Sequence, residues 1–253
     1  MGETLRLEGV SLTYQAENGE IEALRGLSLA VREGELLAIV GPSGCGKSTL
    51  LSVVAGLMPP TAGTVILGGQ RQSGLSPQIG YMLQKDNLLA WRTVRSNVLL
   101  GLELRGQLCP ERVAAVDALL STYGLADFQD KYPSQLSGGM RQRAALIRTL
   151  APGPRVLLLD EAFSALDYQT RLSVTDDVYG ILKSEGQTAL MVTHDIPEAI
   201  SMADRVAVLS ARPARVREVV DITFGAEPLP PLARRNEPAF GRYFNKIWRE
   251  LDA

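Results

Sequence analysis

The glycine-rich segment 41–49, GPSGCGKST, constrains the fold of this chain more than any other segment. It follows the apolar run Leu36–Val40 and ends in Gly46, Lys47 and Ser48. Glycines let backbone N–H groups wrap around phosphate oxygens, the lysine brings a positive charge, and the serine hydroxyl can ligate Mg2+. A helix that starts here adds the positive end of its dipole. The segment therefore predicts a strand, a phosphate-binding loop and a helix. The candidate phosphate-binding residues are Gly41, Pro42, Ser43, Gly44, Cys45, Gly46, Lys47, Ser48 and Thr49.

Short apolar runs later in the chain predict further strands of one sheet. They lie at Val156–Leu159, Leu190–Val192 and Val206–Leu209, and helical patterns at 168–184 and 197–203 separate them. Alternation of strands and helices is typical of a parallel sheet in an α/β fold.

The two ends of the chain have different patterns. Residues 1–40 are expected to form strands with a hairpin turn at Asn18-Gly19, and a second strand pair is expected around 64–67 and 79–82. Prolines in 226–232 predict an extended linker. Six apolar residues at helical spacing then predict an amphipathic helix with Asn236 as its N-cap: Phe240, Tyr243, Phe244, Ile247, Trp248 and Leu251.

That last helix has two possible partners. It either docks on the core of its own chain or contacts another subunit. Its basic residues would suit a position near a membrane: Arg234, Arg235, Arg242, Lys246 and Arg249.

Composition excludes some classes of function. The 253 residues are 45% hydrophobic and 21% charged, and the net charge of -2 gives no support for nucleic-acid binding. Apolar runs are far shorter than the roughly 20 residues needed to span a bilayer, so the chain is not expected to cross a membrane. Cys45 and Cys109 have no metal or redox spacing.

Two acids follow the apolar run Val156–Leu159. The carboxyl ends of parallel strands are where ligands bind in open α/β sheets. We therefore expect Asp160 to hold Mg2+ and Glu161 to orient or deprotonate an attacking water. Taken alone, the pair is equally well explained as a solvated strand end.

The segment 136–143, LSGGMRQR, is a second candidate anion site. A Ser-Gly-Gly turn that opens a helix presents free N–H groups. Because one nucleotide does not need two such loops, the economical explanation is that this turn caps ATP held by a second copy of the chain. An ordinary helix capped by Ser137 is the alternative. The candidate residues of this trans site are Leu136, Ser137, Gly138, Gly139 and Met140.

The LSGGMRQR segment resembles the signature of the ABC ATPase family, and other segments match in order. The resemblance implies that Tyr14 stacks on adenine, that Gln84 contacts Mg2+ or water, and that Asp167 of 164–167 crosses a dimer interface. His194 resembles the switch histidine, which would act beside Glu161 and Lys47 in catalysis. The expected metal ligands are Ser48, Gln84 and Asp160.

The resemblance also implies an architecture. It predicts an α/β fold: a P-loop (RecA-like) ABC ATPase core with an N-terminal antiparallel β subdomain and an inserted α-helical subdomain. The expected divisions are 1–85 for the β subdomain and the first part of the core, 86–149 for the helical signature subdomain, 150–225 for the second part of the core, and 226–253 for the linker and last helix.

The segment 84–94 is similar to the nitrate/sulfonate/taurine importer branch, in which this region faces the permease. Trp91 and its neighbouring leucines would line an apolar groove. Plain packing of the helical subdomain is the alternative.

The branch implies an ATP-hydrolysing importer subunit that uses ATP and Mg2+ and works as a homodimer. Its partners would be transmembrane permease subunits and, indirectly, a solute-binding protein, with no nucleic acid. It would be peripheral on the cytoplasmic face of the membrane. The competing function is a regulatory or nucleic-acid-acting cassette that is not coupled to import.

Overall fold

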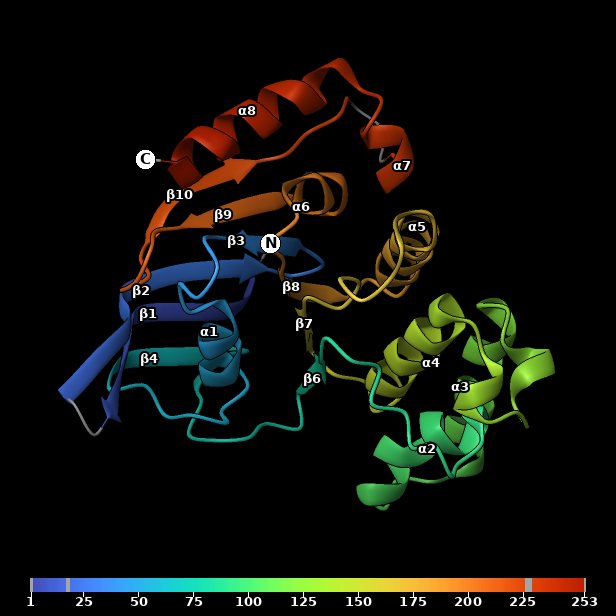
Figure 1. Cartoon of the computed structure of the whole chain (residues 1–253). Helices are drawn as coiled ribbons and strands as arrows, with labels where there is room; N and C mark the ends of the chain where they lie inside the picture. Colours follow the sequence, from blue (N-terminus) through green and yellow to red (C-terminus); the bar gives the residue numbers. More distant parts are fainter. Residues whose placement is uncertain (1, 17–18, 226–228, 253) are drawn as a thin grey trace.

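The computed structural model describes residues 2–16, 19–225 and 229–252. Its strands form a four-stranded sheet in the order β2-β1-β4-β5 and a six-stranded sheet in the order β10-β9-β3-β8-β7-β6. Helices α2, α3 and α4 gather at one side of the molecule, and α8 crosses the opposite end (Figure 1).

The four-stranded sheet is antiparallel. It contains β1 (Glu3–Ala16), β2 (Gly19–Arg32), β4 (Ala62–Leu67) and β5 (Gln70–Arg71). β1 and β2 pair as expected of a hairpin, but residue 18 of the predicted Asn18-Gly19 turn lies outside the described residues.

The six-stranded sheet is parallel except at one edge. Its parallel members are β3 (Leu36–Val40), β6 (Ile79–Met82), β7 (Val156–Asp160), β8 (Thr188–Val192) and β9 (Arg205–Leu209). β10 (Val216–Asp221) runs antiparallel to β9 and was not predicted.

The expected pairing of 64–67 with 79–82 is wrong. β4 pairs with β1, and β6 pairs with β7, in the other sheet. Neighbours in sequence do not pair here because β7 offers β6 a fully buried parallel partner.

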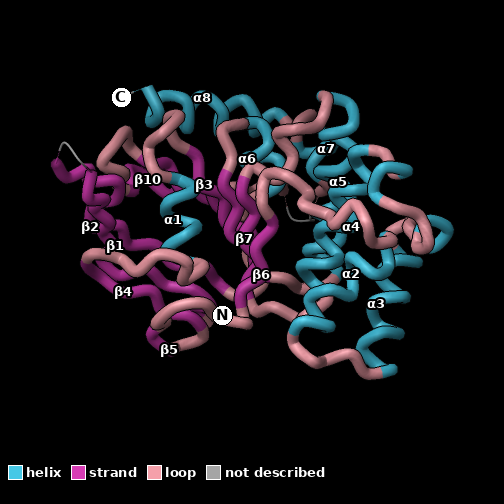
Figure 2. The backbone as a smooth tube through the Cα atoms, turned by 60° about the horizontal axis from the view of Figure 1, so that its bottom comes forward, coloured by secondary structure: helices cyan, strands magenta, loops and turns pink. Residues whose placement is uncertain are grey.

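The six-stranded sheet is covered on both faces, which is why its strands are apolar throughout. Leu36, Ala38 and Val40 point to a core shared with α4 (Gly138–Leu150), α5 (Tyr168–Ser184) and α6 (Ile196–Met202). Leu37 and Ile39 point to a core shared with the antiparallel sheet and α1 (Lys47–Val54). Figure 2 shows α1 among the strands, while α5, α6 and α8 contribute to the core on the other face of the six-stranded sheet.

The helical part has a small core of its own. α2 (Val94–Leu104) and α3 (Pro110–Thr122) pack against α4 through residues such as Val98 and Leu120. Two short 3-10 turns, Ala126–Phe128 and Pro133–Gln135, lead into α4. Gly124 follows α3 with φ 70°, as expected for a helix end.

The C-terminal segment docks on its own chain. α8 (Pro238–Asp252) buries Ile247 completely and packs Phe240 and Tyr243 against the core beside α6. Tyr243 also donates a 3.0 Å hydrogen bond to the Thr223 carbonyl. This packing supports the first of the two expected partners.

Three expectations for the C-terminal segment need correction. Pro231 opens the short helix α7 (Pro231–Arg234), so the extended linker ends before it; residues 226–228 lie outside the described residues. Asn236 does not cap α8, since that helix starts at Pro238 and the Asn236 amide binds the Leu232 carbonyl. Arg234 is buried, not on a basic surface.

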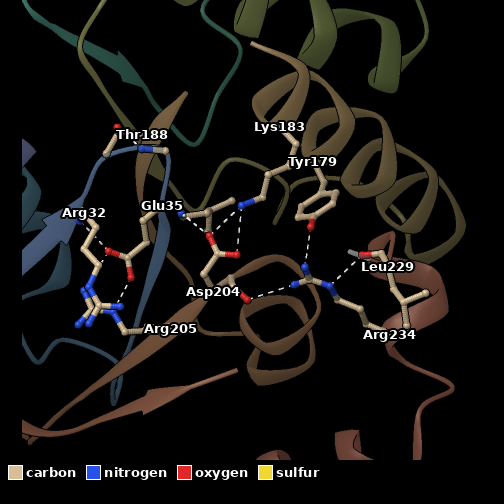
Figure 3. A network of polar contacts seen from close by, with 12 residues as sticks. Arg32, Glu35, Tyr179, Lys183, Thr188, Asp204, Arg205, Leu229 and Arg234 are labelled. Carbon is tan, nitrogen blue, oxygen red and sulfur yellow. Dashed lines mark hydrogen bonds and ion pairs between the residues drawn. The ribbon is translucent and has the colours of Figure 1, made fainter. Parts of the chain in front are cut away.

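The amino ends of the parallel strands are closed by polar contacts (Figure 3). Glu35 forms an ion pair with Arg205, and Asp204 accepts from Lys183 at 2.8 Å and from the Leu36 backbone N–H. The Arg234 guanidinium donates to the Ala203 and Leu229 carbonyls and to the Tyr179 hydroxyl. No helix among the described residues is long and apolar enough to cross a membrane.

Candidate nucleotide site

A cleft of about 530 Å3 lies at the opposite, carboxyl edge of the same sheet. The loop after β3, Glu161 after β7 and His194 after β8 all contribute to its wall. The lining residues are Ser43, Gly44, Gly46, Lys47, Ser48, Thr49, Glu161, His194 and Arg212. Adjacent parallel strands thus bring together residues that are about 150 positions apart, as predicted for this edge.

The loop after β3 runs close to neighbouring backbone, and its glycines are needed for that reason. Gly46 has φ 123°, and a Cβ there would lie 3.1 Å from the Ala23 carbonyl oxygen. At Gly41 a Cβ would lie 2.9 Å from Cys45 Sγ. Cys45 itself is buried in the apolar core, and burial raises the pKa of its thiol.

Lys47 holds the start of the loop. Its ammonium donates to the Gly41 carbonyl at 2.8 Å and to the Pro42 carbonyl at 3.0 Å. Carbonyl oxygens are weak partners for a cation, so a phosphate oxygen that enters the cleft can replace them. The ammonium and the glycine-rich loop therefore fit a polyphosphate.

Ser48 and Asp160 form a pair of hard oxygen donors. Ser48 Oγ lies 3.1 Å from Asp160 Oδ1, and Tyr81 donates to Asp160 Oδ2 at 3.1 Å. Burial raises the pKa of the Asp160 carboxyl, which a nearby cation would reverse. The described residues hold no group of three or more His, Cys, Asp or Glu side chains suited to a metal. A hydroxyl with one carboxylate is nevertheless a fitting set for Mg2+, which completes its shell with water and phosphate oxygens.

Glu161 and His194 contact each other in the wall of the cleft. Glu161 Oε2 lies 3.2 Å from His194 Nδ1. Glu161 has φ 47°, a left-handed conformation that is rare for a side-chain-bearing residue. Its N–H donates to the Val192 carbonyl at 2.9 Å, so β8 fixes the turn that aims the carboxylate. Such strain is characteristic of functional sites.

Gln84 lies at the end of β6, but it is not brought to the candidate metal ligands. Within the described residues its amide donates to Ser164 Oγ at 3.0 Å, not to Ser48 or Asp160. Ser164 in turn donates to the Glu161 carbonyl at 2.9 Å. Gln84 is therefore connected to the Glu161 turn through one hydroxyl.

Tyr14 lies beside the end of the loop. Its hydroxyl is 3.1 Å from Thr49 Oγ1 and also contacts Met58. The ring is half-buried at the margin of the cleft rather than among its lining residues.

The LSGGMRQR turn lies outside this cleft. Ser137 caps α4 by accepting from the Met140 N–H at 3.3 Å, and neither these two residues nor Leu136, Gly138 or Gly139 line the cavity. A Cβ at Gly139 would lie 2.8 Å from Val174 Cγ2, so this glycine permits close packing of α4 on α5. Both explanations of the turn, a helix cap and a site for a second copy, therefore stay open on geometry.

Asp167 plays a local part in the described chain. It caps α5 by accepting from the Thr170 N–H at 3.1 Å, and this bond lowers the pKa of its carboxyl.

No sequence motif pointed to Arg212 or Tyr81, which the structure adds to the site. Arg212 follows β9 and lines the cleft, with its guanidinium donating to the Gly44 carbonyl at 2.8 Å. Tyr81 lies on β6 and binds Asp160. The only available signal for Arg212 was its place just past the carboxyl end of a predicted strand.

A phosphate loop, a paired acid and histidine, and a separate Ser-Gly-Gly turn on one chain point to one family. The sequence model of the family described as "ABC transporter" matches residues 24–164, more than half of the chain. This chain belongs to the ABC transporter family.

Relatives of this ABC ATPase align over nearly the whole chain. It is 45% identical to the ABC transporter ATP-binding protein YtlC of Bacillus subtilis, over 98% of this chain and 96% of the relative. It is 38% identical to the taurine import ATP-binding protein TauB of Roseobacter denitrificans, over 96% and 94%.

Solved structures of ABC cassettes share the fold. The dimeric bacterial ABC transporter cassette MJ0796 has a TM-score of 0.73 at 32% identity and covers 87% of this chain and 99% of its own. CbiO1 of Clostridium perfringens, part of the cbiONQ ABC transporter complex, has a TM-score of 0.77 at 27% identity, over 87% and 89%. The predicted α/β ABC ATPase fold is thus confirmed, and the chain is an ATP-binding, ATP-hydrolysing cassette.

Proposed function

We propose that this ABC ATPase powers uptake of a small solute through separate permease subunits, as a homodimer on the cytoplasmic face of the membrane. The observation that carries the proposal is the split site: Glu161 and His194 share one cleft with the phosphate loop, while the Ser137 turn lies outside it. The importer assignment is supported by the 38% identity to a taurine import ATP-binding protein. Nitrate, sulfonates and taurine-like solutes are the proposed cargo class.

ATP binding is assigned to the loop and its margin. Lys47 and the N–H groups of 41–49 would hold the phosphates, and the helix α1 that begins at Lys47 adds its positive end. Adenine stacking is assigned to Tyr14, and the contact of its hydroxyl with Thr49 at the end of the loop supports this assignment.

Ser48, Asp160 and, after a rearrangement, Gln84 are the proposed Mg2+ ligands. The ion would neutralise charge that develops on the phosphates during transfer. Within the described residues no hydrogen bond joins Gln84 to Ser48 or Asp160. Its amide nitrogen donates to Ser164, and its amide oxygen is the atom that would ligate the ion.

Hydrolysis is assigned to Glu161 with His194. The carboxylate would orient or deprotonate the attacking water, and His194 at 3.2 Å would hold its direction and contact the outermost phosphate. Positioning and charge stabilisation supply most of the catalysis in phosphoryl transfer.

Closure of the cleft is assigned to a second copy of the chain. Residues 136–140 and Asp167 of that copy would close over the outermost phosphate, which is consistent with the dimeric cassettes that share this fold. Ser137→Arg should therefore leave ATP binding within about twofold but lower turnover by about 100-fold or more. Turnover at the wild-type rate would contradict the dimeric site.

The permease contact is assigned to the segment 84–94. Trp91 is 75% exposed and leaves apolar surface uncovered. The leucines of the segment, Leu88 and Leu89, are partly buried, and Leu88 packs against the cores of the sheet and of the helical part, so they do not form an open groove wall with Trp91. Asn97 and Arg148 tie this segment to the helical part: the Asn97 amide exchanges hydrogen bonds with Leu89, and Arg148 donates to the Asp86 and Asn87 carbonyls. Movement of the helical part would thereby reach the permease.

The deciding experiment measures ATPase rate in the assembled transporter. The chain is reconstituted with the permease encoded beside it, with and without its solute-binding protein loaded from a panel of nitrate, sulfonates and taurine. Stimulation by one solute supports import and names the cargo. Intact basal ATPase with no stimulation by any solute would favour the cassette that is not coupled to import.

A further inference from the structure

Arg212 is the cleft residue for which neither the predicted phosphate loop nor the acid and histidine pair accounts. It lies in the connection 210–215 between β9 and β10, at the carboxyl edge of the sheet. Its side chain lines the cleft together with Ser43, Gly44 and Lys47.

The backbone that carries Arg212 is firmly held. The Ala214 N–H donates to the Ala23 carbonyl at 2.9 Å, and the Arg25 N–H donates to the Ala214 carbonyl at 3.0 Å. Ser210 closes the turn by donating to Pro213 and accepting from the Arg215 N–H. The same stretch of β2 lies under Gly46, so the turn and the phosphate loop rest on one support.

The guanidinium of Arg212 has unused donors. It makes one hydrogen bond, at 2.8 Å, to the Gly44 carbonyl, and no ion pair within the described residues involves it. A guanidinium has five N–H donors in a fixed fork, which suits phosphate oxygens. Arg205 at the other edge of the sheet shows the contrast, since Glu35 and the Ala30 carbonyl occupy its donors.

Two cations bracket the start of the phosphate loop. Lys47 holds the Gly41 and Pro42 carbonyls from within, and Arg212 holds the Gly44 carbonyl from the β9 side. Both also line the same cleft as Glu161 and His194, to which the proposed function assigns the attack on the outermost phosphate.

We propose that Arg212 is a further phosphate-binding residue, which contacts the outermost phosphate of a bound nucleoside triphosphate and thereby favours ATP over ADP. The inference rests on the proposed nucleotide site. A charge-assisted contact of this kind is worth about a tenfold change in affinity.

The test measures equilibrium affinity of the full chain for two probes, ADP and the non-hydrolysable analogue adenylyl-imidodiphosphate, both with Mg2+. Arg212→Ala is compared with Arg212→Lys and with Arg215→Ala, an exposed arginine of the same turn that does not line the cleft. Arg212→Ala should weaken the triphosphate analogue about tenfold and ADP less than threefold, and Arg212→Lys should recover part of the loss. Arg215→Ala should change neither.

Two results would overturn the inference. Equal weakening of both probes by Arg212→Ala would mean that the side chain only props the Gly44 carbonyl, and no weakening would mean that it does not contact the nucleotide. Lys47→Ala is the arm that tests the site itself. If Lys47→Ala loses both probes while Arg212→Ala loses neither, the nucleotide site stands and only the role of Arg212 fails.

Discussion

The two edges of the six-stranded sheet carry similar charged residues but use them differently. At the amino edge Glu35, Arg205, Asp204 and Lys183 bind one another (Figure 3). At the carboxyl edge, the hydrogen bonds that Lys47 and Arg212 make within the described parts of the chain all go to backbone carbonyls. A charged cluster by itself is therefore not evidence of a site. A charged side chain that is hydrogen-bonded only to backbone carbonyls, and not to an opposite charge, is a better indication of a ligand site.

The largest effect is expected at the carboxyl edge. Glu161→Gln keeps the shape of the side chain but removes the base, so turnover should fall by about 100-fold or more while ATP binding changes little. The variant should also accumulate as an ATP-bound dimer, measured by light scattering. A monomer at saturating ATP would break the proposed division of the site between two copies.

The next effect belongs to the amino edge and concerns stability. Glu35 is buried, and Glu35→Ala leaves Arg205 without its acid, so the free energy of unfolding should fall by about 3 kcal/mol. Chemical denaturation measures it, with exposed Glu33→Ala as the control. The ATPase rate per folded molecule should not change. A loss of turnover without a loss of stability would contradict the division of labour between the edges.

A buried acid behind His194 gives a pH dependence of intermediate size. Burial raises the pKa of Glu198 from 4.5 to about 7. The buried Glu198 carboxyl is more stable when it is protonated. Its contribution to the free energy of unfolding is therefore complete below about pH 4.5 and is lost as pH rises through about 7. The free energy of unfolding should fall over this window by on the order of 3 kcal/mol. Glu198→Gln should flatten that slope, and an unchanged slope would assign it to other groups.

The smallest effect is expected for a partly exposed ion pair at the amino edge. Lys183 and Asp204 are each about one-third exposed, and solvent screens their attraction. Lys183→Ala should lower the free energy of unfolding by only about 0.5 kcal/mol. A loss of several kcal/mol would show that the amino edge acts as one cooperative network.

Features that depend on a local sequence pattern were predicted correctly. The runs at 156–159, 190–192 and 206–209 are strands because a doubly covered sheet leaves no polar face. The phosphate loop was predicted because its glycine spacing is specific, and α5 was placed at 168–184 as found. The proposed roles of the site residues and the domain boundaries remain predictions.

Strand pairing and side-chain contacts between distant segments could not be predicted from the sequence. Nothing in 64–67 or 79–82 indicates that the two strands belong to different sheets. Arg234 carries the same charge as the exposed Arg242, Lys246 and Arg249. Its approach to the Ala203 carbonyl and the Tyr179 ring, which no local pattern indicates, is what buries it. Arg212 likewise becomes part of the cleft through the pairing of β9 with β3, which no local pattern records.

The left-handed backbone at Glu161 sets the stability of the fold against ATP turnover. Holding a side-chain-bearing residue at φ 47° costs the folded state about 1 kcal/mol, which glycine would not incur. Glu161→Gly should thus give a protein that melts at a higher temperature and turns over no ATP. Only selection for turnover keeps the less stable residue in place, so a duplicated copy released from that selection would be free to drift toward glycine at this position.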